Sequence, residues 1–349
     1  MVTIKEIAKA VGVSSATVSR VLNYDMSLSI TPAKRQAIIE TAEALNYATP
    51  RNRNRTKGES FQFASRSVEM PRLAIVHFLD PFEELTDPYF IGVRLGIESR
   101  CRDYGTEVVK IFHSQTGDHP ALLQNVTGVI AIGRHSRAEI DWLADNSHHL
   151  VFADFMPKRE DLDYVCCDLG SATRALLDGL YAAEYRRIAF IGGQDPVSAD
   201  GQKFGERRCA AYLAWQEERG TLDTKLLALA DLSDHGQNLR LEVGYEQAKI
   251  ILSEKPDVII TANDNMAIGA YRAIQEAGLS IPQDIAVVSY NDIPVAQFLN
   301  PPLSTMRILS EAIGETAVDL LVERINGREY PKHVTIPSEM IWRGSSRRP

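Results

Sequence analysis

Short apolar runs alternate with amphipathic helical patterns from residue 71 almost to the C-terminus, and this alternation constrains the fold more than any other feature. The predicted strands cover 73–78, 107–111, 128–132, 150–153, 188–191, 258–261 and 285–289, and the predicted helices lie near 90–104, 172–184, 204–219, 244–253 and 265–277. Such alternation predicts an α/β domain with parallel, doubly wound sheets and helices on both faces. Because about 270 residues exceed what one such sheet requires, we expect two lobes.

The first fifty residues follow a different, all-helical pattern. Thr3 and Glu6 have the spacing of a capping box, and apolar residues follow at helical intervals until Gly12 interrupts them. A second helix, capped by Ser14 or Ser15, follows this turn, and a third begins near residue 31. The apolar positions of the three helices are Ile4, Ile7, Ala8 and Val11, then Ala16, Val18, Val21 and Leu22, then Ile38, Ala42 and Leu45. Two short helices joined by a glycine-containing turn indicate a helix-turn-helix module.

In such a module the second helix enters the major groove of DNA, with its early residues at the base edges. Arg20 could donate a bidentate pair to guanine, and Asn23 could read a base edge or hold a phosphate. The hydroxyl side chains suit phosphate contacts, which position a protein without reading sequence. The candidate DNA-binding residues of this helix are Ser14, Ser15, Ala16, Thr17, Ser19, Arg20 and Asn23. A small helical bundle with an exposed polar helix would show the same apolar spacing.

The distribution of charge supports the DNA-binding interpretation, although the total does not. The formal net charge of -8 alone would argue against nucleic acid. Residues 1–58, however, contain nine Lys or Arg and four Asp or Glu, a net charge of +5, which leaves -13 for the rest of the chain. Arg51, Arg53 and Arg55 lie in a polar stretch without apolar periodicity, which predicts a basic linker that adds DNA contacts.

Several motifs resemble, in order along the chain, those of the lactose-repressor family of bacterial transcription regulators. The first of them run from Thr3 to Ala8, from Gly12 to Asn23 and from Ala44 to Tyr47; the later ones are Thr86-Asp87-Pro88-Tyr89-Phe90, Arg187 to Gly193, Thr261-Ala262-Asn263-Asp264 and Pro301-Pro302-Leu303-Ser304-Thr305. Within the family, Asn23-Tyr24-Asp25 and Tyr290-Asn291-Asp292-Ile293-Pro294 are most similar to the repressors of galactose operons and of the evolved β-galactosidase.

The resemblance implies a helix-turn-helix domain over residues 1–50, a linker over 51–70, and an effector-binding and dimerisation domain over 71–345. This domain would resemble periplasmic binding proteins, with a chain that crosses three times between its lobes. We expect lobe 1 to comprise 71–168 and 297–330, and lobe 2 to comprise 169–296 and 331–345. No heptad pattern follows Ile341, which favours a homodimer over a tetramer.

Polar residues that follow predicted strands are the candidates for a ligand site, because ligands of open α/β sheets bind beyond the carboxyl ends of the strands. Carboxylates and amides suit sugar hydroxyls, since each can bond two of them at once. By resemblance, the effector-contact positions are Tyr89, Asp154, Arg208, Asn263 and Asn291, with Asp292 adjacent. The Asp and Asn residues could equally be helix caps or turn residues.

Three positions depart from the family pattern in ways that bear on the ligand. The stretch from Gln237 to Arg240 lacks the aromatic residue that several sugar-responsive relatives carry before Gly244, so a stacking face for a sugar is expected to be missing. Cys167 stands where a lining aromatic is frequent, and Asn291 where Asp is common. The linker also lacks the leucine wedge that bends DNA in relatives, and we hypothesise that it acts electrostatically, with less kinking.

These observations predict a repressor of a sugar-utilisation operon. The repressor would bind double-stranded operator DNA and be released from it by a β-galactoside or galactose-like sugar. A corepressor, a different sugar or a nucleoside remain alternatives, as does a sugar-binding receptor, which the basic N-terminal segment disfavours. No motif of a hydrolase, metalloprotease, nucleotide-binding loop or dinucleotide fold is present, so we expect no enzyme, cofactor or metal. We also expect a cytoplasmic protein, because no signal peptide or apolar span is visible.

Overall fold

The computed structural model describes residues 4–22, scattered positions between 30 and 41, and 72–112, 123, 125–194, 206–231 and 239–349. The chain divides into two compact units, Met1–Ser67 and Val68–Pro349. Within the described residues, none of the helices combines the length and apolar character needed to cross a membrane.

The first unit contains the two predicted short helices, α1 (Ile4–Val11) and α2 (Ser15–Leu22). Gly12 makes the turn between them in the left-handed region, at φ 68°, where glycine is the least strained residue. The Ser14 side chain caps α2, because its hydroxyl accepts a hydrogen bond from the Thr17 amide at 3.1 Å. Of the predicted apolar positions, Ala8, Val18, Val21 and Ile38 are buried, Val11 is half-buried and Ala16 is exposed. Ala42 and Leu45 lie outside the described residues.

The second unit contains two six-stranded sheets. The first has the order β11-β5-β4-β3-β1-β2, formed by β1 (Arg72–His77), β2 (Glu107–Phe112), β3 (Gly128–Ile132), β4 (Leu150–Ala153), β5 (Asp163–Cys167) and β11 (His333–Ile336). The second has the order β12-β10-β9-β8-β6-β7, formed by β6 (Ile188–Gln194), β7 (Leu227–Asp231), β8 (Val258–Thr261), β9 (Ala286–Asn291), β10 (Ser304–Ile308) and β12 (Ser338–Ile341). Among the described pairs, β12 on β10 is antiparallel and the others are parallel, as predicted for doubly wound sheets.

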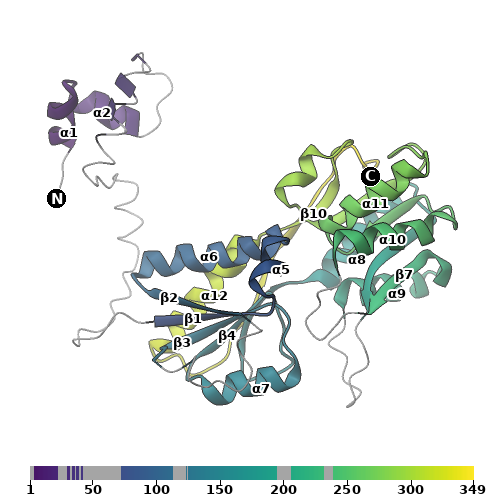
Figure 1. The fold of residues 1–349 in the computed structure, drawn as a ribbon, viewed down its shortest axis with the longest axis horizontal. Helices are drawn as coiled ribbons and strands as arrows, with labels where there is room; N and C mark the ends of the chain where they lie inside the picture. The colour runs from purple at the N-terminus through teal and green to yellow at the C-terminus, as the bar shows by residue number, and fades with distance from the viewer. Residues whose placement is uncertain are drawn as a thin grey trace. The chain divides into compact units, whose positions relative to one another are not determined.

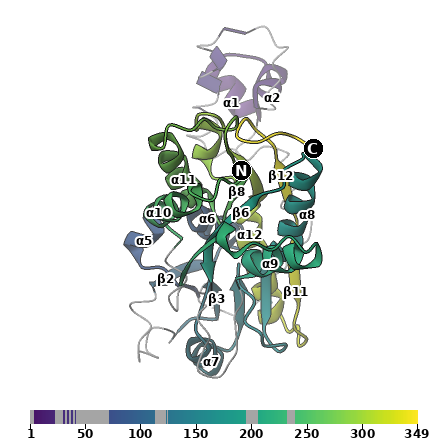
Figure 2. The same ribbon diagram turned by 90° about the vertical axis from the view of Figure 1, so that its right-hand side faces the viewer.

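Helices cover both faces of each sheet, which buries central strands such as β3 and β4 completely, whereas the edge strands β7, β11 and β12 stay partly exposed. In the first lobe, α6 (Pro88–Tyr104) and α12 (Ser310–Ile325) pack side by side on the face that Leu73 and Ile75 occupy, and α7 (Arg137–Asn146) packs on the face of Ala74 and Val76 (Figure 1). In the second lobe, α10 (Leu241–Leu252) and α11 (Asp264–Glu276) lie opposite α8 (Leu169–Ala182) and α9 (Arg207–Glu218) (Figure 2). Alternate residues of a strand thus pack on opposite faces, and continuous burial along the strand is typical of a sheet covered on both sides.

The close packing of α10 on α11 depends on a pair of glycines. A Cβ atom on Gly269 would lie 2.0 Å from the carbonyl oxygen of Leu241, and one on Gly244 would lie 2.3 Å from the carbonyl oxygen of Met266. Because a backbone carbonyl cannot move aside, any larger residue would separate the two helices. This contact fixes the first turn of α10 beside the end of β8, where the ligand cavity lies.

The chain crosses between the lobes three times: between β5 and α8, between β10 and α12, and between β11 and β12. The predicted lobe boundaries at residues 297 and 331 were wrong in detail. The chain stays in the second lobe as far as Ile308, because β10 pairs with β9 in parallel. Residues 333–336 belong to the first lobe, because β11 pairs with β5 in the first sheet. β10 was not predicted because its buried Ser304 and Thr305 interrupt the apolar pattern. Both form hydrogen bonds with residues distant in sequence, which no local pattern indicates.

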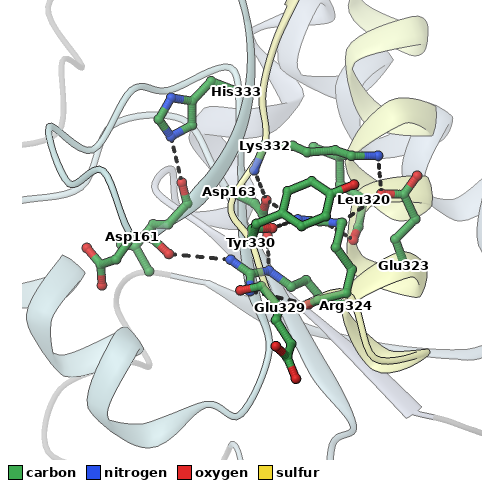
Figure 3. Close-up of polar contacts among 11 residues, drawn as sticks. Asp161, Asp163, Leu320, Glu323, Arg324, Glu329, Tyr330, Lys332 and His333 are labelled. Carbon is green, nitrogen blue, oxygen red and sulfur yellow. Dashed lines mark hydrogen bonds and ion pairs between the residues drawn. The ribbon is translucent and has the colours of Figure 1, made fainter.

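A fully buried carboxylate, Asp163, anchors the last return to the first lobe (Figure 3). It lies at the start of β5 and accepts hydrogen bonds from Arg324, from Arg328 at 2.8 Å, and from the Lys332 amide at 2.5 Å. Glu323 neutralises the outer side of this cluster through Arg328 and Lys332. The cluster therefore ties the end of α12 and the start of β11 to β5.

Candidate functional site

A cavity of about 680 Å³ lies between the two lobes, at the carboxyl ends of their parallel strands. Residues one or two positions beyond β1, β3, β4 and β8, together with the last residue of β9, line it. This is the location expected for a ligand in open α/β sheets, and the volume is within the usual range of about 300–1,000 Å³ for small-molecule pockets. Five of the six residues predicted for the effector line it: Tyr89, Asp154, Arg208, Asn263 and Asn291.

Asp154 and Tyr89 form the acidic part of the wall. Asp154 follows β4 with a left-handed backbone, φ 59°, and burial raises the pKa of its carboxyl group to about 7. Tyr89 is on the first turn of α6, and burial together with the Asp154 carboxylate raises the pKa of its hydroxyl well above the usual value. Among the described residues, no partner of standard hydrogen-bond geometry satisfies this hydroxyl, but it lies beside the Asp154 carboxylate, to which it can donate.

Arg208 contributes a buried positive charge from the first turn of α9. Its Nε donates to the Glu206 carboxylate at 2.7 Å, and its guanidinium also donates to the carbonyl oxygen of Ala262 after β8. Glu206 is itself the N-cap of α9 and accepts from the Cys209 amide at 2.9 Å. Only 11% of the Arg208 side chain and 6% of the Glu206 side chain are exposed, so the pair is shielded from bulk water.

The two asparagines come from the ends of adjacent strands. Asn263 caps α11 by accepting from the Met266 amide at 2.9 Å, and its amide group donates to the carbonyl oxygen of Leu239 at 3.0 Å. It is therefore both a helix cap and a cavity residue, the two roles that its sequence position allowed. Asn291 ends β9 with φ 107°, a left-handed backbone that orients this residue at the cavity wall.

Asp292 does not line this cavity, and its prediction as an effector contact was therefore wrong in placement. Its carboxylate accepts from Arg307 Nε at 2.7 Å and from an Arg343 guanidinium nitrogen at 2.6 Å. Both arginines come from strands or loops distant in sequence, so the pairing could not be read from local pattern. Asp292 instead borders a second, smaller cavity of about 400 Å³ at the N-terminus of α12. Cys167 is buried and absent from the lining of the larger cavity.

Sequence analysis missed the aromatic part of the cavity. Phe78, Phe82, Phe90 and Phe155 line it from the first lobe, so the expected lack of an aromatic face was wrong. Phe78 and Phe155 lie just beyond β1 and β4, and the strand-end rule would have found them had it been applied to apolar residues. Asp87 also lines the cavity; it caps α6 through the Tyr89 amide at 3.1 Å, and burial raises its pKa to about 6.

The outer face of α2 carries the residues predicted to contact DNA. Ser14, Ser15, Ala16 and Arg20 are exposed, and Thr17 and Ser19 are half-buried. The helix contains no acidic residue in its first turn, and Arg20 is in its last turn. Asn23, Arg51, Arg53 and Arg55, and with them the linker hypothesis, lie outside the described residues.

Both parts of the chain match models of known protein families. Residues 3–50 match the model of the lacI family of bacterial regulatory proteins, and residues 177–346 match that of the periplasmic binding protein-like domain. The HTH-type transcriptional repressor MelR of Bacillus subtilis is 35% identical over 99% of this chain and 97% of its own length. This chain belongs to the lacI family. As a family member it is a transcriptional repressor with a sugar-binding domain, not an enzyme.

Two further proteins are similar to this chain, one in sequence over part of it and one in fold. The lactose operon repressor of Rhizobium radiobacter is 73% identical over 110 residues, which are 31% of this chain and 97% of that sequence. A lac repressor dimer bound to operator and an anti-inducer superposes with a TM-score of 0.66, at 22% identity, over 99% of this chain and 98% of its own. At this identity the superposition shows that the fold is shared.

The raised pKa of Asp154 predicts a characteristic dependence of stability on pH. Because the folded state binds this proton more tightly than the unfolded chain, whose Asp pKa is near 3.8, the group's contribution to stability falls as pH rises from about 4 to 7. The Asp154→Asn variant lacks this titration. We therefore expect it to be more stable than the wild type at pH 8, with a difference that shrinks toward pH 5. Urea denaturation at both pH values measures this, and a difference independent of pH would contradict the assignment.

Proposed function

We propose that this lacI-family repressor controls a sugar-utilisation operon and releases its operator when galactose or a β-galactoside binds in the cavity between the lobes. The observation that carries the proposal is the cavity itself. It combines a carboxylate, a guanidinium and two amides at strand ends, in a chain whose first unit presents a helix-turn-helix surface.

The chemistry of the wall fits a sugar. Asp154 and Asn291 offer acceptors for hydroxyl hydrogens, and Arg208 and the Tyr89 hydroxyl offer donors, so neighbouring hydroxyls can be bonded in pairs. The phenylalanines that line the first lobe supply an apolar surface for the C–H face of a pyranose ring. A buried site of this type rejects molecules that leave its polar groups unpaired.

A ligand in this cavity contacts both lobes at once, which provides a route to regulation. Tyr89 and Asp154 belong to the first lobe, and Arg208, Asn263 and Asn291 belong to the second. A sugar that bonds both sets favours one relative orientation of the lobes over others. We propose that the protein is a homodimer, in which that orientation controls how two α2 helices are presented to the half-sites of an operator. The lactose operon repressor of Rhizobium radiobacter, which is similar to part of this chain, motivates the choice of galactosides as probes.

Fluorescence anisotropy with the full-length protein tests the proposal. The labelled duplex would be selected by the protein from a random-sequence pool, and its affinity would be measured at fixed salt with galactose, lactose, melibiose or glucose added. We expect a galactoside to weaken operator binding. Tighter binding on sugar addition would indicate a corepressor, and unchanged binding with every sugar would overturn the proposed effector class.

Substitution of Arg20 by alanine should weaken binding to the selected duplex by about 1–3 kcal/mol, because a base-reading arginine is lost. Lys9→Ala is the matched control: it removes the same charge from the exposed last turn of α1, outside the recognition helix. We expect Lys9→Ala to change affinity for selected and random duplexes by the same factor, whereas Arg20→Ala reduces their ratio. An unchanged ratio for Arg20→Ala would show that α2 reads bases through other residues.

A further inference from the structure

Asp264, the first residue of α11, is a fully buried residue that does not line the cavity between the lobes. Burial raises the pKa of its carboxyl group to about 7. One carboxyl oxygen accepts from the Ile293 amide at 2.8 Å, and the other accepts from the Thr305 hydroxyl at 2.8 Å. A buried carboxyl group is costly unless donors satisfy it, so both bonds restrain the segments that provide them. Asp264 therefore connects the start of α11 to the residues after β9 and to β10.

The residues at the end of β9 adopt a backbone conformation that needs such support. Asn291 has φ 107° and Asp292 has φ 57°, and residues other than glycine rarely adopt this left-handed region. Such conformations persist where surrounding contacts hold them. The Asp292 amide donates to the Thr305 hydroxyl oxygen at 3.3 Å, and the next amide, that of Ile293, donates to Asp264. Asp264 and Thr305 together thus hold two consecutive amides of the turn 291–293.

This turn determines where Asn291 lies in the cavity wall. The described residues provide no side-chain hydrogen bond to Asn291, so its position follows from the backbone of the turn. Asn263, by contrast, is held by contacts of its own, because its side chain caps α11 through the Met266 amide and donates to the carbonyl oxygen of Leu239. Although Asn263 directly precedes Asp264, loss of the carboxyl group should therefore displace Asn291 more.

We propose that Asp264 is a positioning residue of the effector site: it holds the turn 291–293 so that Asn291 lies in the cavity wall, and it does not contact the ligand. A carboxyl group suits this role because its two oxygens can accept from donors on two separate elements at once. This inference rests on the proposed function, and it names a residue behind the cavity wall on which sugar binding depends.

Isothermal titration calorimetry on the full-length protein tests the assignment, with galactose, lactose and melibiose as probes. Asp264→Ala should weaken the tightest-binding of these sugars about tenfold, because the Ile293 amide loses its acceptor and the turn is no longer held. Asp264→Asn should keep the affinity within about threefold of the wild type, because its amide oxygen can still accept from the same amide.

Thr305→Val tests the same turn from β10. It removes the donor to Asp264 and the acceptor of the Asp292 amide while keeping nearly the same side-chain shape. It should also weaken sugar binding about tenfold. If Asp264→Ala does not fold, Thr305→Val decides the question in its place.

A double-mutant cycle distinguishes positioning from a general loss of structure. Asn291→Ala removes the cavity residue itself, so Asp264→Ala or Thr305→Val added to it should weaken sugar binding no further.

Asp257→Ala is the matched control for stability. The Asp257 carboxylate accepts from the Arg186 and Arg187 amides, each at 2.8 Å, in the same lobe but at the opposite end of β8 from the cavity. This variant should lower the free energy of unfolding, measured by urea denaturation, without changing the affinity for sugar.

The possible outcomes separate this inference from the proposed function. If no sugar binds the wild type, the proposed function itself fails, and the positioning role fails with it. If a sugar binds the wild type, Asp264→Ala and Thr305→Val equally well, the positioning role is wrong while the sugar-responsive function stands. Additive losses in the double variants, or an equal loss in Asp257→Ala, would also overturn the inference, because the effect would then not act through Asn291.

Discussion

Replacement of Asp163 by asparagine should lower the free energy of unfolding by about 3–5 kcal/mol, the cost of leaving buried charges without their partner. Asp163 is fully buried, and the side chain of Arg328, one of its two arginine partners, is only 6% exposed. Asparagine has nearly the same shape, so no cavity forms, and the loss reports the charge together with one acceptor oxygen, which becomes an NH2 donor facing other donors. The measurement is a urea denaturation curve of the full-length protein.

Asp161→Asn provides the control for this prediction. It makes the same chemical change two residues earlier, but the Asp161 side chain is 62% exposed and pairs with Arg159 at the surface. Exposed pairs of this kind contribute about 0–1 kcal/mol. Similar losses in the two variants would show that the buried cluster does not hold β5, α12 and β11 together.

Replacement of Arg208 by methionine should weaken sugar binding about 100-fold, since hydrogen bonds to a charged group contribute roughly 1.5–3 kcal/mol. It should also destabilise the second lobe, because Glu206 would remain buried without its partner. Methionine preserves much of the length and packing of the arginine. Calorimetric titration with the tightest-binding sugar and urea denaturation measure the two effects separately.

A double variant, Glu206→Gln with Arg208→Met, distinguishes the binding role of Arg208 from its structural role. Glutamine removes the unpaired charge and retains the acceptor that caps α9 through the Cys209 amide. We expect stability to recover toward that of the wild type while sugar affinity stays low. Recovery of both would mean that Arg208 shapes the cavity without contacting the ligand.

The sequence predicted strands that are nearly unbroken apolar runs. Strands such as β3, with the sequence Gly-Val-Ile-Ala-Ile, cannot be soluble unless they are covered on both faces, so their pattern alone identifies them. β5 and β10 were missed because each carries buried polar residues, Asp163 in the former and Ser304 and Thr305 in the latter. Their partners come from other segments of the chain, and no local pattern records such tertiary hydrogen bonds.

The residues of the candidate site also differ in how far the sequence could predict them. Asp154, Asn263 and Asn291 were predictable because the ends of parallel strands meet at one edge of a sheet. Asp292 follows the same rule but is held by Arg307 and Arg343 outside the cavity. Phe82, by contrast, lines the cavity although it does not follow a strand end, and it was therefore missed. It lies on the five-residue helix α5 (Pro81–Leu85), which no periodicity could indicate. The contacts of Glu83 with Arg240 and of Thr86, just after this helix, with Asn265 are visible only in three dimensions.

The three crossings between the lobes restrict how this sensor can be recombined with other proteins. Neither lobe is a continuous segment, and the last crossing leaves one C-terminal strand in each sheet. A chimera that exchanged a single stretch of sequence for one lobe would therefore take strands from both. The first unit, by contrast, ends before Val68 and is joined to the rest at one point. We therefore expect new combinations of operator and effector to arise when the first unit of one protein is joined to the entire second unit of another. A single lobe cannot be exchanged in this way.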